Sequence, residues 1–465
     1  MNAPLIWIIF PLGLSLLLLI LRKNYFLSCL IQAGASFILV SLAIFSSLDT
    51  VSSSASQIIE VNPVFNFLGR SLVIDKSVKT MIIIFYSFLG AWTSSLYFFK
   101  IKSKIVPLGL AFIALLLSTL SVEPFLYSAL ILEIAVIISV IMVTDSSALS
   151  NKGALRYLIY FTIGMPFVLL AGWYLAGGEI TPVNEEQLIQ ATLLLGLGFV
   201  FWLGVFPFQS WIPLIAEENR STESLFLLIL MPVSVVVLLL KYLNGFVWLR
   251  EYLIVYQALR LFGLIMVVTG AVWAFFQKNF NRMIGYLLIV STGMMLLSVS
   301  IKTTSGFILS SYFIFSRLSS FFVLSWLLFL LTREYENMDI SSLQSLFLKS
   351  PFAGFAILLS MFSISGMPFT SGFPAMQAFY ANFSAESTIM NFGVIISIGI
   401  ISILFLRINF LVLSRFNDTK TISITQSEKA FLMLLILLLL LSGLIPNVFF
   451  PGFAGIVNGY EFLVK

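Results

Sequence analysis

The sequence predicts an all-α integral membrane protein with about 14 transmembrane helices. The first observation is composition: of 465 residues, 60% are hydrophobic and only 10% are charged, and the mean hydropathy is +1.08. A soluble domain carries about a quarter charged residues to cover its surface, so lipid must be the solvent of this chain. The second observation is that apolar runs of about 20 residues, the length that crosses a bilayer core, recur along the whole chain.

The apolar runs end at charged residues or at clusters of glycine, proline and asparagine. The first run has no positive residue before it and no small-residue cleavage site, so we expect a retained helix rather than a removable signal. Within a few residues at each end, the runs lie at 4–21, 26–46, 80–99, 106–120, 124–143, 155–176, 191–212, 223–243, 253–276, 284–300, 307–332, 351–371, 389–414 and 429–449.

The distribution of positive charge predicts an orientation. If both termini lie outside, fifteen of the 25 lysines and arginines fall in loops on the inner side and seven on the outer side. By the positive-inside rule, the side with fifteen is cytoplasmic and both termini are outside. We therefore expect a multi-pass protein of the bacterial inner (cytoplasmic) membrane or of another energy-transducing membrane.

Several kinds of chemistry are disfavoured by the residue types. There is one cysteine, Cys29, and no histidine. We therefore expect no disulfide, no Cys/His zinc site, no haem ligation and no histidine-based catalysis, and so no catalytic residue, metal site or cofactor in this chain. No run of lysine or arginine is long enough to follow the phosphates of a nucleic acid. Any nucleotide, flavin or iron–sulfur chemistry would reside on a partner.

The only long hydrophilic stretch lies near the N-terminus, at 47–79. It contains the strand-like segment VFNFLGRSLVID, and we expect it to form a surface hairpin. The predicted organisation has four parts. They are 1–105, with three helices and this hairpin loop; 106–243, a first five-helix repeat; 253–414, a second five-helix repeat; and 415–465, with helix 14 and a tail.

Two of the predicted helices carry residues that interrupt a helix. Proline removes a backbone donor and clashes with the preceding turn, so the freed carbonyl groups must meet protein or water, and such helices usually line a cavity. The alternative without a functional role is a simple proline kink in each helix. The residues concerned are Pro207 and Pro213 in helix 7, and Gly366, Pro368, Gly372 and Pro374 in helix 12.

The spacing of the two broken helices predicts an internal repeat. They lie five helices apart, as expected if helices 4–8 and helices 9–13 are two copies of one unit that are inverted in the membrane. Discontinuous helices at corresponding positions of two such halves indicate a transport path between them.

Four segments, in order along the whole chain, carry a resemblance to a known family. This family comprises the antiporter-like subunits of respiratory complex I. Related subunits occur in multisubunit Na⁺/H⁺ (Mrp) antiporters, membrane-bound hydrogenases and some inorganic-carbon uptake complexes. The segments that resemble the family's fifth, seventh, tenth and twelfth helices are ALILEIAVIISVIMV (129–143), GVFPFQSWIPLIAEENRST (204–222), QKNFNRMIGYLLIVSTGMM (277–295) and FSISGMPFTSGFPAMQAFY (362–380).

The resemblance implies a proton path at mid-membrane, through a glutamate on the fifth helix and lysines on the seventh, eighth and twelfth. A buried lysine suits such a path because desolvation lowers its pKa toward neutrality. Glu133 stands at the glutamate position, and Arg317 stands where many relatives have a lysine on helix 11. The three lysine positions depart from the pattern, because they hold Trp202, Pro232 or Val233, and Met376.

Four charged residues lie at depth in the predicted helices and are candidates for a proton or ion pathway. They are Glu133, Arg260, Arg317 and Arg407. An isolated charge at the bilayer centre costs at least about 2.5–3.5 kcal/mol, so each is expected to be paired or hydrated. Our hypothesis is that Glu133 and one of the arginines form a buried couple. The alternative is that Arg260 and Arg407 extend from helix ends to the membrane interface.

Three functional hypotheses follow. The first is a membrane-arm subunit of a complex I-like or Mrp-like assembly, which takes part in translocating protons or monovalent cations with other membrane subunits as partners; a name such as NADH:quinone oxidoreductase subunit would then describe the complex. Because arginine does not deprotonate in proteins, the second is a degenerate, non-conducting scaffold subunit of the same fold. The third is a stand-alone secondary transporter of a small solute.

Overall fold

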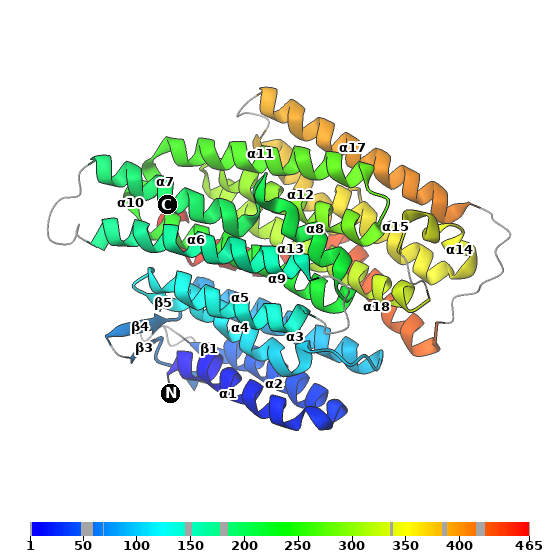
Figure 1. Ribbon diagram of the computed structural model, residues 1–465, viewed down its shortest axis with the longest axis horizontal. Helices are drawn as coiled ribbons and strands as arrows, with labels where there is room; N and C mark the ends of the chain where they lie inside the picture. Colours follow the sequence, from blue (N-terminus) through cyan, green and yellow to red (C-terminus); the bar gives the residue numbers. More distant parts are fainter. Residues whose placement is uncertain are drawn as a thin grey trace.

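The fold is a bundle of helices that run side by side, with both termini at the same end (Figure 1). This placement of the ends agrees with an even number of crossings. The computed structural model describes residues 2–47, 59–67, 69–144, 151–176, 185–334, 338–383, 388–414 and 424–464.

The predicted crossings correspond to helices of the structure. Within the described residues, ten helices are long and apolar enough to span a membrane, and four further apolar helices are shorter. In chain order the crossings are η1 with α1 (Leu5–Ile9 and Phe10–Ile20), α2 (Tyr25–Phe45), α3 (Lys76–Phe98), α4 (Ile105–Ser121), α5 (Tyr127–Val143), α6 (Lys152–Ala176), α7 with η4 and α8 (Glu185–Leu203, Phe208–Ser210 and Trp211–Glu218), α9 (Ser221–Gly245), α11 (Leu253–Phe276), α12 (Phe280–Val299), α13 (Thr304–Glu334), α15 with α16 (Pro351–Ser365 and Gly372–Phe383), α17 (Thr388–Leu413) and α18 (Gln426–Leu444).

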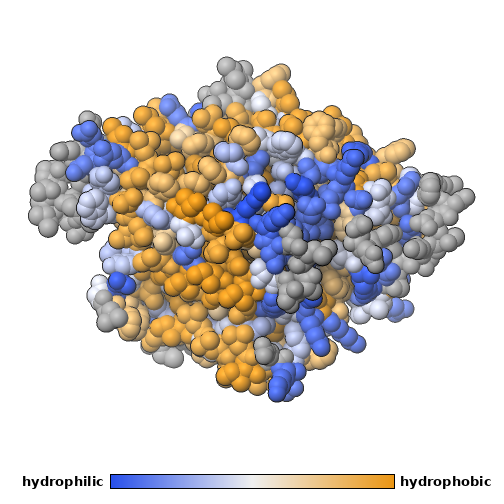
Figure 2. Space-filling model, viewed as in Figure 1, coloured by the Kyte–Doolittle hydropathy of each residue, from blue (hydrophilic) through white to orange (hydrophobic). Residues whose placement is uncertain are grey.

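Helix α9 lies at the centre of the bundle. Its apolar window is 100% buried, against 28% for the peripheral helix α18. A helix that is apolar all round is expected either in a core or against lipid, and here neighbouring helices enclose it. The outer surface is apolar too: Figure 2 shows hydrophobic side chains over much of one face, with hydrophilic ones gathered toward its right-hand end. The chain is therefore a multi-pass integral membrane protein.

Both of the interrupted crossings break at a glycine in the left-handed region. After α7 the chain leaves the helix at Gly204, with φ +65°, and after α15 it does so at Gly366, with φ +73°. Glycine adopts this conformation without the clash that a Cβ would cause. The second segments of the two crossings, α8 and α16, then start at Trp211 and Gly372.

The four prolines predicted to interrupt these crossings fall into two groups. Pro207 and Pro368 lie in the breaks themselves. Pro213 and Pro374, in contrast, are each the third residue of the second segment, α8 or α16. Amides of a first turn have no intrahelical acceptor, so a proline is tolerated there. Pro213 and Pro374 therefore mark the start of the second segments, which corrects their interpretation as breakers.

The last crossing is interrupted as well, which the apolar run did not indicate. After α18 ends at Leu444, Ile445 has φ −123° and ψ 65°, and α19 (Pro446–Asn458) follows. Proline cannot extend the helix and disfavours helical backbone in the residue before it. The expected single helix at 429–449 is therefore wrong at its end, and the expected tail is α19, packed against α3 and α13, followed by α20 (Glu461–Val464).

The hydrophilic stretch near the N-terminus contains the hairpin that its pattern predicts. Strands β3 (Val64–Phe67) and β4 (Arg70–Val73) pair antiparallel, and β4 also pairs with β5 (Val122–Glu123). Gly69, with φ +73°, provides the turn. Part of the stretch, 48–58, lies outside the described residues. The remaining elements are β1 (Ser46–Ser47) paired with β2 (Ile59–Glu60), η2 (Leu21–Lys23), α10 (Val247–Glu251), η5 (Ile340–Leu343) and α14 (Leu346–Lys349).

A glycine on α18 lets this helix approach the break in the twelfth crossing. A Cβ at Gly443 would lie 2.5 Å from the backbone of Thr370. We expect Gly443→Ala to lower the free energy of unfolding by about 1–3 kcal/mol, because the rigid backbone of the break cannot move aside. Gly399→Ala on α17 is the matched control, since no atom lies within 4 Å of a Cβ there. Thermal unfolding in detergent measures both, and equal midpoints would contradict the proposed contact.

Candidate functional site

Arg317 lies in α13 and is 2% exposed. Two of its hydrogen bonds reach α9: Nε donates to the Ile229 carbonyl at 3.1 Å and Nη2 to the Leu228 carbonyl at 2.6 Å. Nη1 donates to α12, to the Leu288 carbonyl at 2.8 Å and to Thr292 Oγ1 at 3.1 Å. All four acceptors are neutral oxygens. The guanidinium charge is thus solvated by dipoles rather than by a carboxylate.

A proline explains why α9 has a carbonyl available for Arg317. In an α-helix the amide of residue i bonds the carbonyl of residue i−4. Pro232 lies inside α9 and has no N–H, so the Leu228 carbonyl lacks its donor within the helix. The bilayer core has no water to replace that donor. Arg317 supplies it, and Pro232 and Arg317 are therefore complementary parts of one site.

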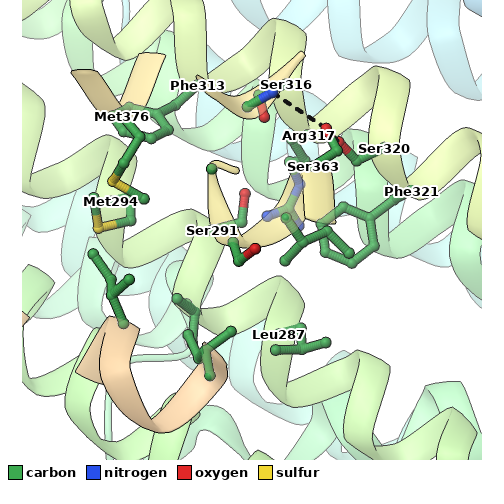
Figure 3. Close-up of a pocket in the computed structure, with 17 residues that line it drawn as sticks. Leu287, Ser291, Met294, Phe313, Ser316, Arg317, Ser320, Phe321, Ser363 and Met376 are labelled. Carbon is green, nitrogen blue, oxygen red and sulfur yellow. Dashed lines mark hydrogen bonds between the residues drawn. The ribbon is translucent and has the colours of Figure 1, made fainter. Parts of the chain in front are cut away.

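A cavity of about 30 Å³ lies beside Arg317, between α12, α13, α15, α16 and α17 (Figure 3). A polar cavity holds a water molecule once it offers about 10–15 Å³, so this one has room for a small polar guest. Gly366 and Gly372, at the two ends of the break in the twelfth crossing, form part of its wall. Its polar lining consists of Arg317 and the serines Ser291, Ser316, Ser320, Ser363 and Ser365.

Hydroxyl groups continue from this cavity into the break of the twelfth crossing. Ser320 Oγ is 2.7 Å from Ser363 Oγ, and both residues are labelled in Figure 3. Ser371 Oγ lies 2.8 Å from Ser363 Oγ and 2.8 Å from Ser319 Oγ. The amide of Gly372 donates to Ser363 Oγ at 3.2 Å. These serines satisfy backbone and side-chain polar groups where the helix is interrupted, as a break in a membrane requires.

Glu133 occupies a different part of the bundle. It lies on α5, is half-buried, and accepts a hydrogen bond from Thr162 Oγ1 of α6 at 2.6 Å. Its neighbours on the helix, Leu130, Ile134 and Ile137, are 40%, 50% and 47% exposed. The carboxyl group is therefore close to the outer surface of α5 and α6 rather than at the centre of the bundle.

The hypothesis of a buried couple between Glu133 and an arginine is wrong for the part of the chain that the structure describes. Arg317 is held by α9 and α12, and α9 packs between α5 and α13. Arg260, on α11, donates to the Ser300 carbonyl at 3.1 Å. Arg407, on α17, is exposed. The four candidate pathway residues thus occupy separate places and are not gathered into one cluster.

The three positions where the resemblance implies lysines hold buried apolar side chains. Trp202 is 1% exposed and donates its Nε1 hydrogen to the Phe161 carbonyl at 3.1 Å. Val233 is fully buried in α9, and Met376 forms part of the cavity wall beside Arg317. None of these side chains can carry a proton.

The two predicted halves meet at the first broken crossing. Gln209 of η4 accepts a hydrogen bond from Thr269 of α11 at 3.2 Å. Helix α8 packs tightly against α12, where a Cβ on Gly285 would lie 2.5 Å from the Cα of Pro213. The break of the first half is thus held by helices of the second half. The inverted relation between the halves stays a prediction.

The serines and Pro232 belong to this site but were not among the candidate residues predicted from the sequence. For the serines a signal was present in SSYFIFSRLSSFF, residues 310–322, because hydroxyls flank the intramembrane Arg317 on both sides. Ser316 and Ser320, four residues apart, share a helix face. Pro232 was visible as a proline inside an apolar run, but the sequence does not reveal that α13 packs against it and supplies the missing donor.

Fold and site together define a multi-pass membrane protein in which interrupted helices surround a small polar cavity in an apolar bundle. Residues 125–405 match the family described as NADH:quinone oxidoreductase/Mrp antiporter, transmembrane, and the chain belongs to this family. The suspected resemblance to antiporter-like subunits is thereby confirmed.

Comparison with individual proteins agrees with this family assignment. The chain is 26% identical over 208 residues to NADH-quinone oxidoreductase subunit N of Francisella tularensis, covering 43% of this chain and 42% of that protein. It is 22% identical to subunit N 1 of Chloroherpeton thalassium, covering 64% and 66%. The chain thus spans less than half of the first relative's length in this match.

Solved structures share the fold over almost the whole chain. A chain of the Mrp complex from Dietzia sp. superposes with a TM-score of 0.83 at 14% identity, covering 100% of this chain and 99% of that one. A chain of the archaeal membrane-bound sulfane sulfur reductase gives 0.82 at 15% identity, covering 99% and 98%. A chain of Thermus thermophilus respiratory complex I with bound NADH gives 0.78 at 18% identity, covering 100% and 99%.

The complementarity of Pro232 and Arg317 is testable by a double-mutant cycle. In Arg317→Met protein the Leu228 carbonyl loses its donor, and Pro232→Ala can supply an amide in its place. We therefore expect Pro232→Ala to stabilise the Arg317→Met protein more than the wild type, by about 1–3 kcal/mol, the cost of an unsatisfied buried polar group.

The control for this cycle is Pro166→Ala. Pro166 also lies inside a helix, α6, so its replacement has the same propensity effect without a link to Arg317. Its effect should be equal in both backgrounds when unfolding in detergent is measured. Equal effects of Pro232→Ala in the two backgrounds would contradict the link between Pro232 and Arg317.

Proposed function

We propose that the chain is a membrane-arm subunit of a complex I-like or Mrp-like assembly and takes part in the translocation of protons or monovalent cations with partner subunits. The observation that carries the proposal is the pair of crossings interrupted at Gly204 and Gly366, with a polar cavity at the second break, in a chain of this family. Discontinuous helices of this kind form ion paths in membrane transporters.

Glu133 is the group best suited to exchange a proton. A carboxyl group alternates between charged and neutral forms, and the Thr162 hydroxyl at 2.6 Å stabilises its charged form through a hydrogen bond. Its position near the outer surface of α5 and α6 allows a neighbouring subunit to approach it. Since ionisable groups at membrane depth are costly, a carboxyl kept there is a functional candidate by default.

Arg317 plays a different part in this proposal. Its guanidinium keeps its charge, so it cannot accept and release protons in a relay. Fixed within α9, α12 and α13, it sets a constant positive potential at the second break. The second half of the chain would then shape the field along the path, while Glu133 exchanges the proton.

A non-conducting scaffold of the same fold is the second candidate. The buried Trp202, Val233 and Met376, at positions where the resemblance implies lysines, favour it. In that case the chain would hold the assembly together and seal the membrane, and changes at Glu133 would leave activity intact.

Glu133→Gln tests the proposal directly. We expect this change to lower proton or cation flux of the assembled complex several-fold, because glutamine keeps the size and hydrogen-bonding capacity of the side chain but cannot exchange a proton. Flux is measured in proteoliposomes with a pH-sensitive dye and a sodium-sensitive dye. Glu251→Gln is the control, since Glu251 is exposed at the end of α10.

The outcomes separate the candidates. Normal flux in a fully assembled Glu133→Gln complex would reject the pathway role and favour the scaffold, and deletion of the chain should then dissolve the complex. Uptake of a small solute by the purified chain alone in liposomes would instead support a stand-alone transporter.

A further inference from the structure

The cavity beside Arg317 carries an excess of positive charge. Arg317 has five N–H groups, and four of its hydrogen bonds go to neutral oxygens, so one N–H on Nη2 has no acceptor among the described residues. No aspartate or glutamate is among the described residues that line the cavity. A buried cation without an opposite charge is costly in a low-dielectric interior.

A helix terminus adds to this positive potential. Helix α16 has 12 residues and begins at Gly372, on the cavity wall. The N-terminus of a helix carries a partial positive charge and attracts anions. The C-terminus of α15 also reaches the cavity, but amides of Gly366 and Met367 already cap its Ser363 and Phe362 carbonyls, at 3.1 Å and 2.9 Å. The first two amides of α16 are likewise used, by Ser363 Oγ at 3.2 Å and by the Thr370 carbonyl at 3.1 Å, so this terminus contributes its dipole rather than free donors.

Two hydroxyl groups on the cavity wall are free to donate. Ser316 is 9% exposed and Ser291 is partly buried, and neither side chain has a hydrogen-bond partner in the part of the chain that the structure describes. Both are among the lining residues labelled in Figure 3, together with Arg317. A buried hydroxyl normally finds a partner. These donors, with Arg317, would surround a small anion.

We propose that this cavity binds a small monovalent anion of the chloride type, held by hydrogen bonds from Arg317, Ser316 and Ser291, with the dipole of α16 adding a favourable potential. The volume of about 30 Å³ admits a halide but excludes a large organic anion such as gluconate. The anion neutralises the guanidinium and satisfies the donors that the protein leaves open. Neither the family match nor the candidate pathway through Glu133 implies this site.

The test compares halides with gluconate at constant ionic strength. A ligand that binds only the folded state raises the unfolding temperature with its concentration. For the full chain purified in detergent, we expect chloride and bromide to raise the unfolding temperature by several degrees and to saturate, while gluconate has no effect. Ser316→Ala should raise the halide concentration at half-effect several-fold, and Arg317→Met should abolish the effect. Arg407→Met, an exposed arginine on α17, should keep it.

A structural readout protects the test against variants that fail to fold. In wild-type crystals grown with bromide, the anomalous signal should show a peak within hydrogen-bond distance of Arg317 and Ser316. Coincident chloride and gluconate curves, or a cavity that holds only water in the bromide crystals, would overturn the proposal. Because no flux is measured, failure of the anion site and failure of the translocation proposal are distinguishable.

Discussion

The position of Arg317 is the constraint on which the rest of the second half depends. A charge in the middle of an apolar bundle is tolerated only where polar groups replace its hydration. Here α9 offers the Leu228 carbonyl that Pro232 leaves without a donor, and α12 offers Leu288 and Thr292. Three helices are thereby fixed around one side chain. A proline that weakens a helix elsewhere becomes useful here, because the carbonyl that it frees is the acceptor that the arginine needs.

The interrupted crossings solve a related problem in another way. Each break leaves backbone groups without helical partners inside the apolar bundle, and each begins at a left-handed glycine, Gly204 or Gly366. At the second break a chain of serine hydroxyls takes up these groups and continues to the cavity beside Arg317. At the first break, Gln209 bonds Thr269 of the other half. Polar side chains at both breaks thus form hydrogen bonds that water would otherwise form, and they make the interior polar where the helices stop.

Much of this architecture could be predicted from the sequence, because lipid imposes a strict length and apolarity on every crossing. The two breaks were predictable for a similar reason, since Pro207, Gly366 and Pro368 stand out within apolar runs. What could not be predicted was partner choice. The predicted couple between Glu133 and Arg317 does not form because α9 lies between α5 and α13. No local sequence pattern tells which helices will be neighbours. The interruption before Pro446 was missed because it lies close to the end of the predicted run, 429–449, where a helix is expected to stop.

The same physics divides the chain into two electrostatically different halves. Glu133 sits near the surface of α5 and α6 with the Thr162 hydroxyl as its hydrogen-bond partner, and its carboxyl group can change its charge. Arg317 sits where charge cannot change, among backbone dipoles that are themselves immobile. A relay needs groups that alternate, and a field needs groups that do not. In the proposed translocation, the proton-exchanging step therefore belongs to the half with the carboxylate. The half with the guanidinium sets the potential against which that step works, and an anion in its cavity would set the magnitude of that potential.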